Sequence, residues 1–254
     1  MKTSPENGVQ ENASVFARQT EMSGLRSWLR ERRSFLLHGP SGVGKTLLLS
    51  AIRPEIPKLL YSAQNATPQA VYRNLAGTLL AEGDRAVARL GSGGTAFLSD
   101  KSALTIKGVV RDAIRNSGYF IVLDHLLRPS QALAAVIREL RVSCSVPVVA
   151  VARSDHMEDA GFVAPLFPDR TERFGIRNFD PETAAQFAQR RADAESLQAE
   201  NMAQFLEKVV EYSDGNPGAM LQMVRMAKAA KYLHQGHIKV APLYIDYKLT
   251  TVAG

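Results

Sequence analysis

The sequence predicts an α/β fold, in which a parallel sheet flanked by helices is followed by a small C-terminal helical lid. Two nearly continuous apolar runs, residues 119–124 and 146–152, lack the polar alternation of a half-exposed strand. Such runs are typical of central parallel strands that are buried on both faces. Amphipathic segments separate these runs, whereas three helical segments and no apolar strand follow residue 180. Strands that alternate with helices indicate a parallel sheet, and the later change of pattern marks a second unit.

Composition places the chain among ordinary globular proteins with a sizeable core. It has 254 residues, of which 45% are hydrophobic and 22% charged. No stretch approaches the roughly 18 apolar residues of a membrane span, and the polar N-terminus lacks the apolar core of a signal peptide. We therefore expect a cytoplasmic protein without membrane contact. The net charge of +6 permits a nucleic-acid partner but fits a scattered basic surface equally well.

The elements of the sheet domain follow in order along residues 14–178. Residues 1–13 are polar and are expected to form a disordered tail. A helix is predicted over 22–33, where apolar residues share one face, and strands are predicted over 35–38 and 58–62. Thr67 and Pro68 indicate a helix start, because Thr is a favoured N-cap and Pro is tolerated at the first helical position. Two more predicted helices, 102–116 and 130–141, precede the apolar strands.

The lid is assigned to residues 179–235. Asp180 and Pro181 form a second helix-start signal, and three helices are predicted over 181–195, 200–213 and 217–233. The final segment, residues 236–254, is expected to be extended and to pack back on the body. The single cysteine, Cys144, has no partner for an internal disulfide and is expected to be a packed thiol.

A glycine-rich run follows the first predicted strand and matches the phosphate-loop pattern GxxxxGK(S/T) at every fixed position. Its residues are Gly39, Pro40, Ser41, Gly42, Val43, Gly44, Lys45 and Thr46. Glycines let the backbone curl so that N–H groups face phosphates, and Lys45 supplies a charge to the β- and γ-phosphates. The Thr46 hydroxyl can ligate Mg²⁺, and the helix that continues with Leu47 directs its positive end at the same anion. The run predicts binding of ATP or ADP with Mg²⁺.

Two further residues stand at the ends of the apolar strands. Asp124 ends the first run, in the arrangement called Walker B, and is expected to hold the metal together with Thr46. Arg153 follows the second run, where a cation can contact the γ-phosphate, although an ion pair with Asp155 is the alternative. We expect Lys45, Asp124 and Arg153 to take part in catalysis.

Two other segments allow more than one interpretation. Pro217 begins the last predicted lid helix and can lie against an adenine ring, or it can simply form a helix corner. Arg170 and Arg173 fall where ring-forming ATPases carry an arginine finger for a neighbouring subunit, and ordinary surface ion pairs are the alternative.

Together these residues resemble the AAA+ superfamily of P-loop ATPases, and within it the branch of origin-recognition and STAND-type switch ATPases. The similarity covers roughly residues 14–233. It includes residues 15–21, which are similar to an F-x-G-R-x-x-E box that helps enclose adenine, with Ala17 in place of the usual Gly. It also includes the phosphate loop, Asp124, Arg153 as a sensor arginine, and a lid G-x-P motif at residues 215–217. Residues 65–68 resemble transposition-regulator ATPases.

The resemblance implies an AAA+ fold and an ATP-dependent switch that hydrolyses ATP to ADP and phosphate. His125 stands where the family usually has a Glu that polarises the attacking water, so efficient hydrolysis is in doubt. The chain ends soon after the lid, so we expect its output to come through a homo-oligomer or a separately encoded partner. The alternatives are a DNA-binding ATPase adaptor of the transposition-regulator type and a non-hydrolysing nucleotide-bound scaffold.

Overall fold

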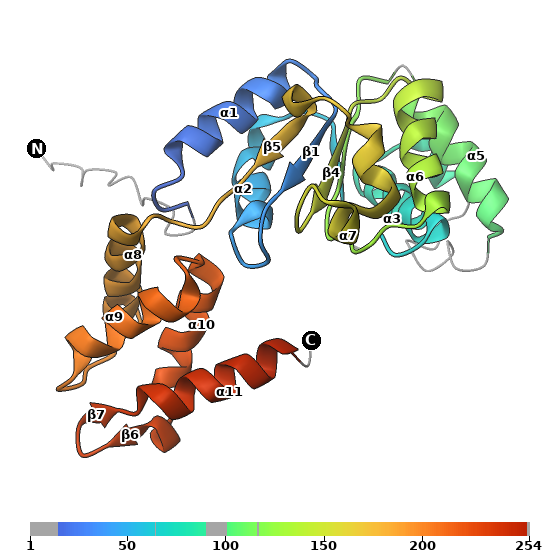
Figure 1. Ribbon diagram of the computed structural model, residues 1–254. Helices are drawn as coiled ribbons and strands as arrows, with labels where there is room; N and C mark the ends of the chain where they lie inside the picture. The colour runs from blue at the N-terminus through green and yellow to red at the C-terminus, as the bar shows by residue number, and fades with distance from the viewer. Residues whose placement is uncertain (1–14, 64, 90–100, 116, 253–254) are drawn as a thin grey trace, which may run out of the picture.

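A computed structural model describes residues 15–63, 65–89, 101–115 and 117–252. A sheet domain is joined to a helical lid through residues 176–180, and the lid lies to one side of the sheet domain (Figure 1). The predicted tail, residues 1–13, falls outside the described residues. Among the described helices, none combines the length and the apolar character needed to cross a membrane.

The sheet has five parallel strands in the order β2-β3-β4-β1-β5. The strands are β1 (Phe35–His38), β2 (Leu59–Ser62), β3 (Phe120–Leu123), β4 (Val148–Ala152) and β5 (Arg173–Gly175). The apolar strands β3 and β4 are neighbours, and β1 pairs with β4 on its other side. The loops after β1, β3 and β4 therefore leave the same edge of the sheet, where parallel sheets bind ligands. The predicted parallel α/β sheet is confirmed.

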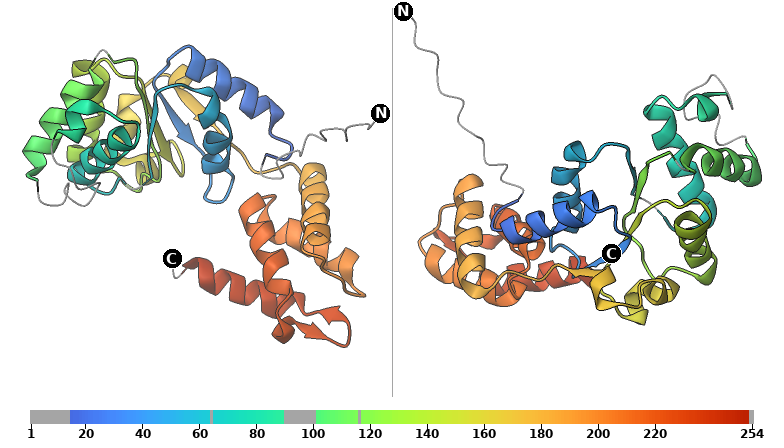
Figure 2. Two further views of the ribbon diagram at one scale, coloured as in Figure 1. Left: turned by 180° about the vertical axis from the view of Figure 1, so that it is seen from behind. Right: turned by 90° about the horizontal axis from the view of Figure 1, so that it is seen from above.

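Helices cover both faces of this sheet (Figure 2). Side chains alternate along β1, so that Leu36 packs into the core under α3, α5 and α6, whereas Phe35 and Leu37 pack against α1 and α2. This two-sided burial explains why the strands read as continuous apolar runs. The helices are α1 (Gln19–Arg30), α2 (Lys45–Ile52), α3 (Pro68–Ala81), α4 (Arg85–Ala88), α5 (Ala103–Ile114), α6 (Gln131–Arg138) and α7 (Met157–Ala160). Cys144 is a buried free thiol in the same core as Leu36, under α3, α5 and α6, as predicted.

The lid packs around a core of its own. It contains α8 (Pro181–Ala194), α9 (Met202–Ser213), α10 (Pro217–Ala227), the hairpin β6 (Leu233–His234) and β7 (His237–Ile238), and α11 (Val240–Val252). Both predicted caps are confirmed: the side chains of Thr67 and Asp180 accept hydrogen bonds from the N–H groups of Ala70 and Thr183.

The prediction of an extended segment over residues 236–254 was wrong. In the part of this segment that the structure describes, residues 236–252, only His237–Ile238 forms a strand, and Val240–Val252 forms α11. The segment is rich in residues that favour strands, but Leu243 is buried in the lid core and Tyr244 and Tyr247 pack against it. This spacing lies on one face of a helix, and burial of that face overrides strand propensity.

Candidate nucleotide-binding site

The phosphate loop lies between β1 and α2, and its conformation requires its glycines. Gly42 and Gly44 have φ angles of +80° and +102°, in a region that other residues rarely adopt. A Cβ atom at Gly39 would lie 2.2 Å from the carbonyl oxygen of Ile176, and one at Gly42 would lie 2.7 Å from Asn216 Oδ1. The glycines therefore permit the tight turn of the loop. They also permit the close approach of the lid and of residues 176–180, the hinge between the two domains.

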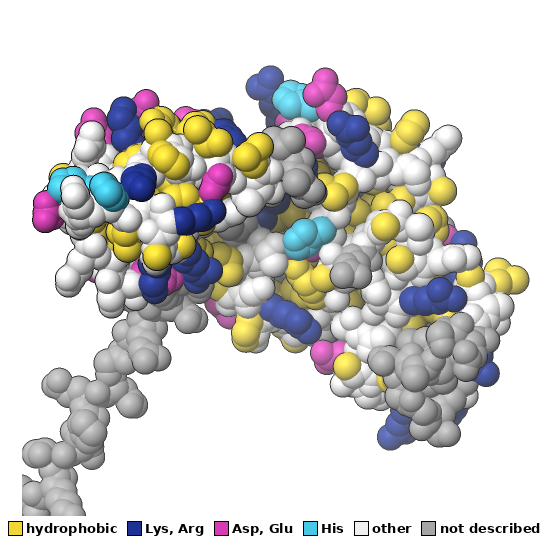
Figure 3. Space-filling model, turned by 90° about the horizontal axis from the view of Figure 1, so that it is seen from below, with side chains coloured by type: hydrophobic (Ala, Val, Ile, Leu, Met, Phe, Trp, Pro, Cys, Tyr) yellow, Lys and Arg dark blue, Asp and Glu magenta, His cyan; other side chains and the backbone are white. Residues whose placement is uncertain are grey.

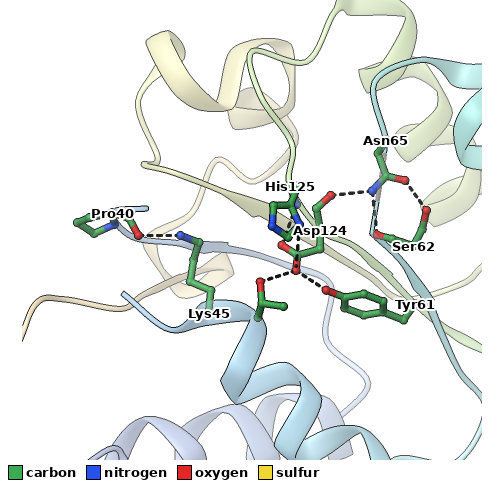
Figure 4. Close-up of polar contacts among 8 residues, drawn as sticks. Pro40, Lys45, Tyr61, Ser62, Asn65, Asp124 and His125 are labelled. Atoms are coloured by element: carbon green, nitrogen blue, oxygen red, sulfur yellow. Dashed lines mark hydrogen bonds and ion pairs between the residues drawn. The ribbon is translucent and has the colours of Figure 1, made fainter. Parts of the chain in front are cut away.

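Lys45 folds back onto the loop in this structure. Its Nζ atom donates to the carbonyl oxygen of Gly39 at 2.6 Å. It also donates to the carbonyl oxygen of Pro40 at 3.0 Å (Figure 4). Burial lowers the pKa of the Lys45 amine to about 8, an effect that Asp124 opposes and Arg153 reinforces. Lys45 also lines a cavity together with Asp124 and Arg153, and a lysine ammonium group is a common donor to phosphate oxygens.

The carboxylate of Asp124 is 2% exposed and is surrounded by donors. Its Oδ2 atom accepts a hydrogen bond from Thr46 Oγ1 at 2.8 Å and another from the Tyr61 hydroxyl, while Oδ1 accepts from the His125 N–H at 2.7 Å (Figure 4). Adjacent hydroxyl and carboxylate oxygens are the donors that Mg²⁺ prefers, so Thr46 and Asp124 fit this metal. Sequence reasoning missed Tyr61, because nothing in strand β2 indicates that its hydroxyl meets Asp124.

His125 takes an unusual backbone conformation beside this carboxylate. Its φ angle is +56°, its side chain is 62% exposed, and Nδ1 lies 3.4 Å from Asp124 Oδ2. The buried Asn65 amide donates to the carbonyl oxygen of Asp124 at 2.8 Å and so fixes the end of β3. The side chain of His125 therefore lies beside the Asp124 carboxylate while remaining open to solvent.

Arg153 is exposed at the end of β4 and lines the same cavity as Lys45 and Asp124. Within the described residues its guanidinium forms no ion pair, so the expected alternative with Asp155 is not observed. Asp155 pairs instead with Arg173, with Nη1 and Oδ2 3.2 Å apart. Arg173 is thereby engaged within its own chain.

A cavity of about 360 Å³ brings most predicted site residues together. Those that line it are Ser41, Gly42, Gly44, Lys45, Thr46, Leu47, Asp124 and Arg153. Gly39 and Pro40 lie behind it, where their carbonyl groups accept from Lys45.

A second, smaller and largely apolar cavity of about 90 Å³ adjoins the first through Gly42, Gly44, Leu47 and Gly218. Its lining includes three aromatic rings and two predicted residues: Phe16, Phe179, Phe187, Val43 and Pro217. The Arg18 guanidinium lies 4.2 Å from the centre of the Phe179 ring. An aromatic lining next to a phosphate loop has the chemistry to contact a nucleobase.

Arg18 and Ala17 belong to the box that precedes α1. Arg18 Nη2 donates to the carbonyl oxygens of Arg177 at 2.8 Å and Val43 at 3.3 Å, so it joins the hinge to the phosphate loop. Ala17 has a φ angle of +53°, the left-handed conformation that explains why related boxes carry glycine there.

Comparisons of the sequence found no matching protein-family model and no matching curated protein. The structure is similar to that of the Walker-type ATPase paby2304 of Pyrococcus abyssi, with a TM-score of 0.62 and 19% identity over 100% of this chain and 77% of that one. It is also similar to a chain in the structure of Drosophila ORC bound to DNA, with a TM-score of 0.55 and 13% identity over 100% of this chain and 70% of that one. The fold of this chain is therefore that of the AAA+ P-loop ATPases.

Proposed function

We propose that the chain binds ATP with Mg²⁺ between the sheet domain and the lid and acts as a nucleotide-dependent switch. The observation that carries this proposal is the convergence of Lys45, Thr46, Asp124 and Arg153 on one cavity beside an aromatic one. Two cations line that cavity together with a carboxylate–hydroxyl pair, and the adjoining aromatic cavity places a site for a base beside the site for phosphates.

Each group has a distinct part in this proposal. The aromatic rings and Pro217 would enclose the base, and the free N–H groups of the loop would bind phosphate oxygens. Lys45 and Arg153 would balance phosphate charge, and Thr46 and Asp124 would hold Mg²⁺, which supplies further charge neutralisation when bound. ADP would bind the same groups without the γ-phosphate contact of Arg153.

Hydrolysis of ATP to ADP and phosphate is proposed to be slow. The position after Asp124 carries His125, whose imidazole has a different reach from a Glu carboxylate and would be repelled, when protonated, by Lys45 and the metal. A switch of this kind changes state mainly through nucleotide binding and release.

Calorimetric titration of the purified protein with ATP and Mg²⁺ tests binding. Lys45→Ala is expected to abolish it, whereas Lys228→Ala, which removes a lid lysine that pairs with Glu195, is the matched control and should bind normally. Turnover is then measured in wild type and in His125→Glu. Slow wild-type turnover that rises in His125→Glu supports the switch, and ATP binding unaffected by Lys45→Ala contradicts it.

A DNA-binding ATPase adaptor is the second candidate, since the chain carries a net charge of +6 and one structural neighbour was solved bound to DNA. On the face shown in Figure 3, Lys and Arg side chains are scattered rather than gathered into one patch. This candidate predicts a mobility shift of duplex DNA that requires ATP and weakens steeply with salt. In either case the protein would act as a homo-oligomer or through a separately encoded partner. Tight ATP binding without ATP turnover would instead favour a non-hydrolysing scaffold.

A further inference from the structure

The first five carbonyl groups of the phosphate loop are each held by a hydrogen bond from the protein itself. Five consecutive carbonyl oxygens, those of residues 39–43, accept hydrogen bonds from protein donors. The donors are Lys45 Nζ for residues 39 and 40, Asn216 Nδ2 for residue 41, the Gly218 N–H for residue 42 and Arg18 Nη2 for residue 43. Two of these five contacts therefore come from the start of lid helix α10.

Holding a carbonyl also directs the next N–H group. In a trans peptide the C=O and the following N–H point in opposite directions, and the described residues contain no cis peptide. The Ser41 carbonyl points at the lid, so the Gly42 N–H points away from it. Among the described residues, the N–H groups of Gly42 and Gly44 have no protein acceptor, so both are free to bind an anion.

Asn216 makes the contact between the lid and the Ser41 carbonyl through a buried side chain with several partners. Its side chain is largely buried, with 9% of the residue exposed, and Nδ2 donates to the Ser41 carbonyl at 2.9 Å and to Asn178 Oδ1 at 3.1 Å. Its Oδ1 atom accepts from the Ala219 N–H at 3.1 Å and thereby caps α10. One side chain thus joins the phosphate loop, the hinge and the lid helix.

We infer that Asn216 is a positioning residue for nucleotide phosphates: by holding the Ser41 carbonyl it turns the Gly42 N–H toward the bound phosphate. The inference rests on the proposed function, since it presupposes ATP in the loop. The lid would then have two roles in nucleotide binding. It would enclose the base, and its residue Asn216 would set the geometry of the phosphate loop.

Two substitutions separate this contact from the helix cap. Asn216→Ser keeps a favoured, neutral N-cap oxygen but is too short to donate to the Ser41 carbonyl. Asn216→Asp keeps the cap and places a carboxylate oxygen against that carbonyl. Asp180→Ser changes the cap of α8 and is the control for cap replacement elsewhere in the lid.

ATP and adenosine affinities are measured for each variant by competition with a fluorescent ATP analogue. Loss of the positioning bond is expected to weaken ATP binding about tenfold in both Asn216 variants, while adenosine binding stays within about twofold. Asp180→Ser should match wild type. Unchanged ATP binding in Asn216→Ser, or an equal loss for ATP and adenosine, would overturn the inference, since a damaged base cavity weakens both ligands alike.

Amide hydrogen exchange of the nucleotide-free protein tests the Asn216 contact separately from ATP binding. The Gly218 N–H, which donates to the Gly42 carbonyl at 3.0 Å, is expected to exchange faster in Asn216→Ser while the interior of α10 keeps its protection. Wild type that binds no ATP would refute the proposed function, and the Gly218 exchange would still report whether Asn216 holds the loop. Identical exchange in wild type and Asn216→Ser refutes the contact.

Discussion

Gly218 offers a sharp test of the contact between lid and phosphate loop. A Cβ atom at this position would lie 2.8 Å from Gly42 Cα and 2.9 Å from the Gly42 carbonyl oxygen. Ordinary contact begins at 3.4 Å, so Gly218→Ala must move one backbone by about 0.6 Å. The obstructing atoms belong to the main chain, so a rotamer change cannot relieve the overlap.

The effect on binding follows from the hydrogen bonds that depend on this approach. The Gly218 N–H bond to Gly42 and the Asn216 bond to Ser41 contribute about 1 kcal/mol each, or about 2 kcal/mol of lid docking together. Loss of both lowers the docked fraction of the free protein, and the apparent ATP affinity falls by up to about 30-fold. The free energy of unfolding should fall by about 1 kcal/mol, since the loss of about 2 kcal/mol of lid docking exceeds the gain of up to about 1 kcal/mol from the better helix propensity of Ala.

Calorimetric titration with ATP and urea unfolding measure the two quantities separately. Gly108→Ala is the matched control, because Gly108 lies in α5 with no atom within 4 Å of an added Cβ. It should gain up to about 1 kcal/mol of stability and bind ATP normally. Gly218→Ala that binds ATP as tightly as wild type would refute the argument that the lid and the loop meet backbone to backbone.

Three further predictions concern other parts of the chain. Ala17→Gly should raise the free energy of unfolding by about 1 kcal/mol in urea titrations, because Gly adopts the left-handed conformation at φ +53° without strain; a loss of stability would contradict this. Burial lowers the pKa of His38, so the unfolded state binds its proton at higher pH than the folded state does. Stability should therefore fall as pH drops below about 6.5, and thermal unfolding of His38→Gln between pH 5 and 7.5 should show a flatter dependence. Asp124→Asn should remove the effect of Mg²⁺ on ATP affinity measured by calorimetry, while a persisting Mg²⁺ effect would place the metal elsewhere.

Local signals were enough to predict the sheet and the phosphate loop. Strands β3 and β4 are buried on both faces, so their sequences are apolar throughout, and the loop has residue types that its backbone conformation demands. The placement of Asp124 beside Thr46 also followed, because parallel strands β1 and β3 end at the same edge of the sheet.

Contacts between distant segments could not be predicted in this way. The Tyr61 hydroxyl reaches Asp124 only because β2 pairs with β3 in a particular register. Asn216 belongs to a recognisable lid motif, but its bond to Ser41 spans 175 positions of the chain. Helix α11 was missed for a related reason: its residues favour strands locally, and only burial against the lid core overrides that preference.

These distant contacts make the lid and the phosphate loop one thermodynamic unit. Arg18 ties the loop to the hinge, and Asn216 ties both to α10, so the geometry that binds phosphate is also the geometry that docks the lid. Coupling of this kind is reciprocal: a ligand that favours the docked lid is itself bound more tightly by it. A partner that pulls on the lid would therefore release nucleotide without any contact to the phosphates. In the proposed switch, which carries His125 where a Glu would polarise the attacking water, such release would reset the protein even where hydrolysis is slow.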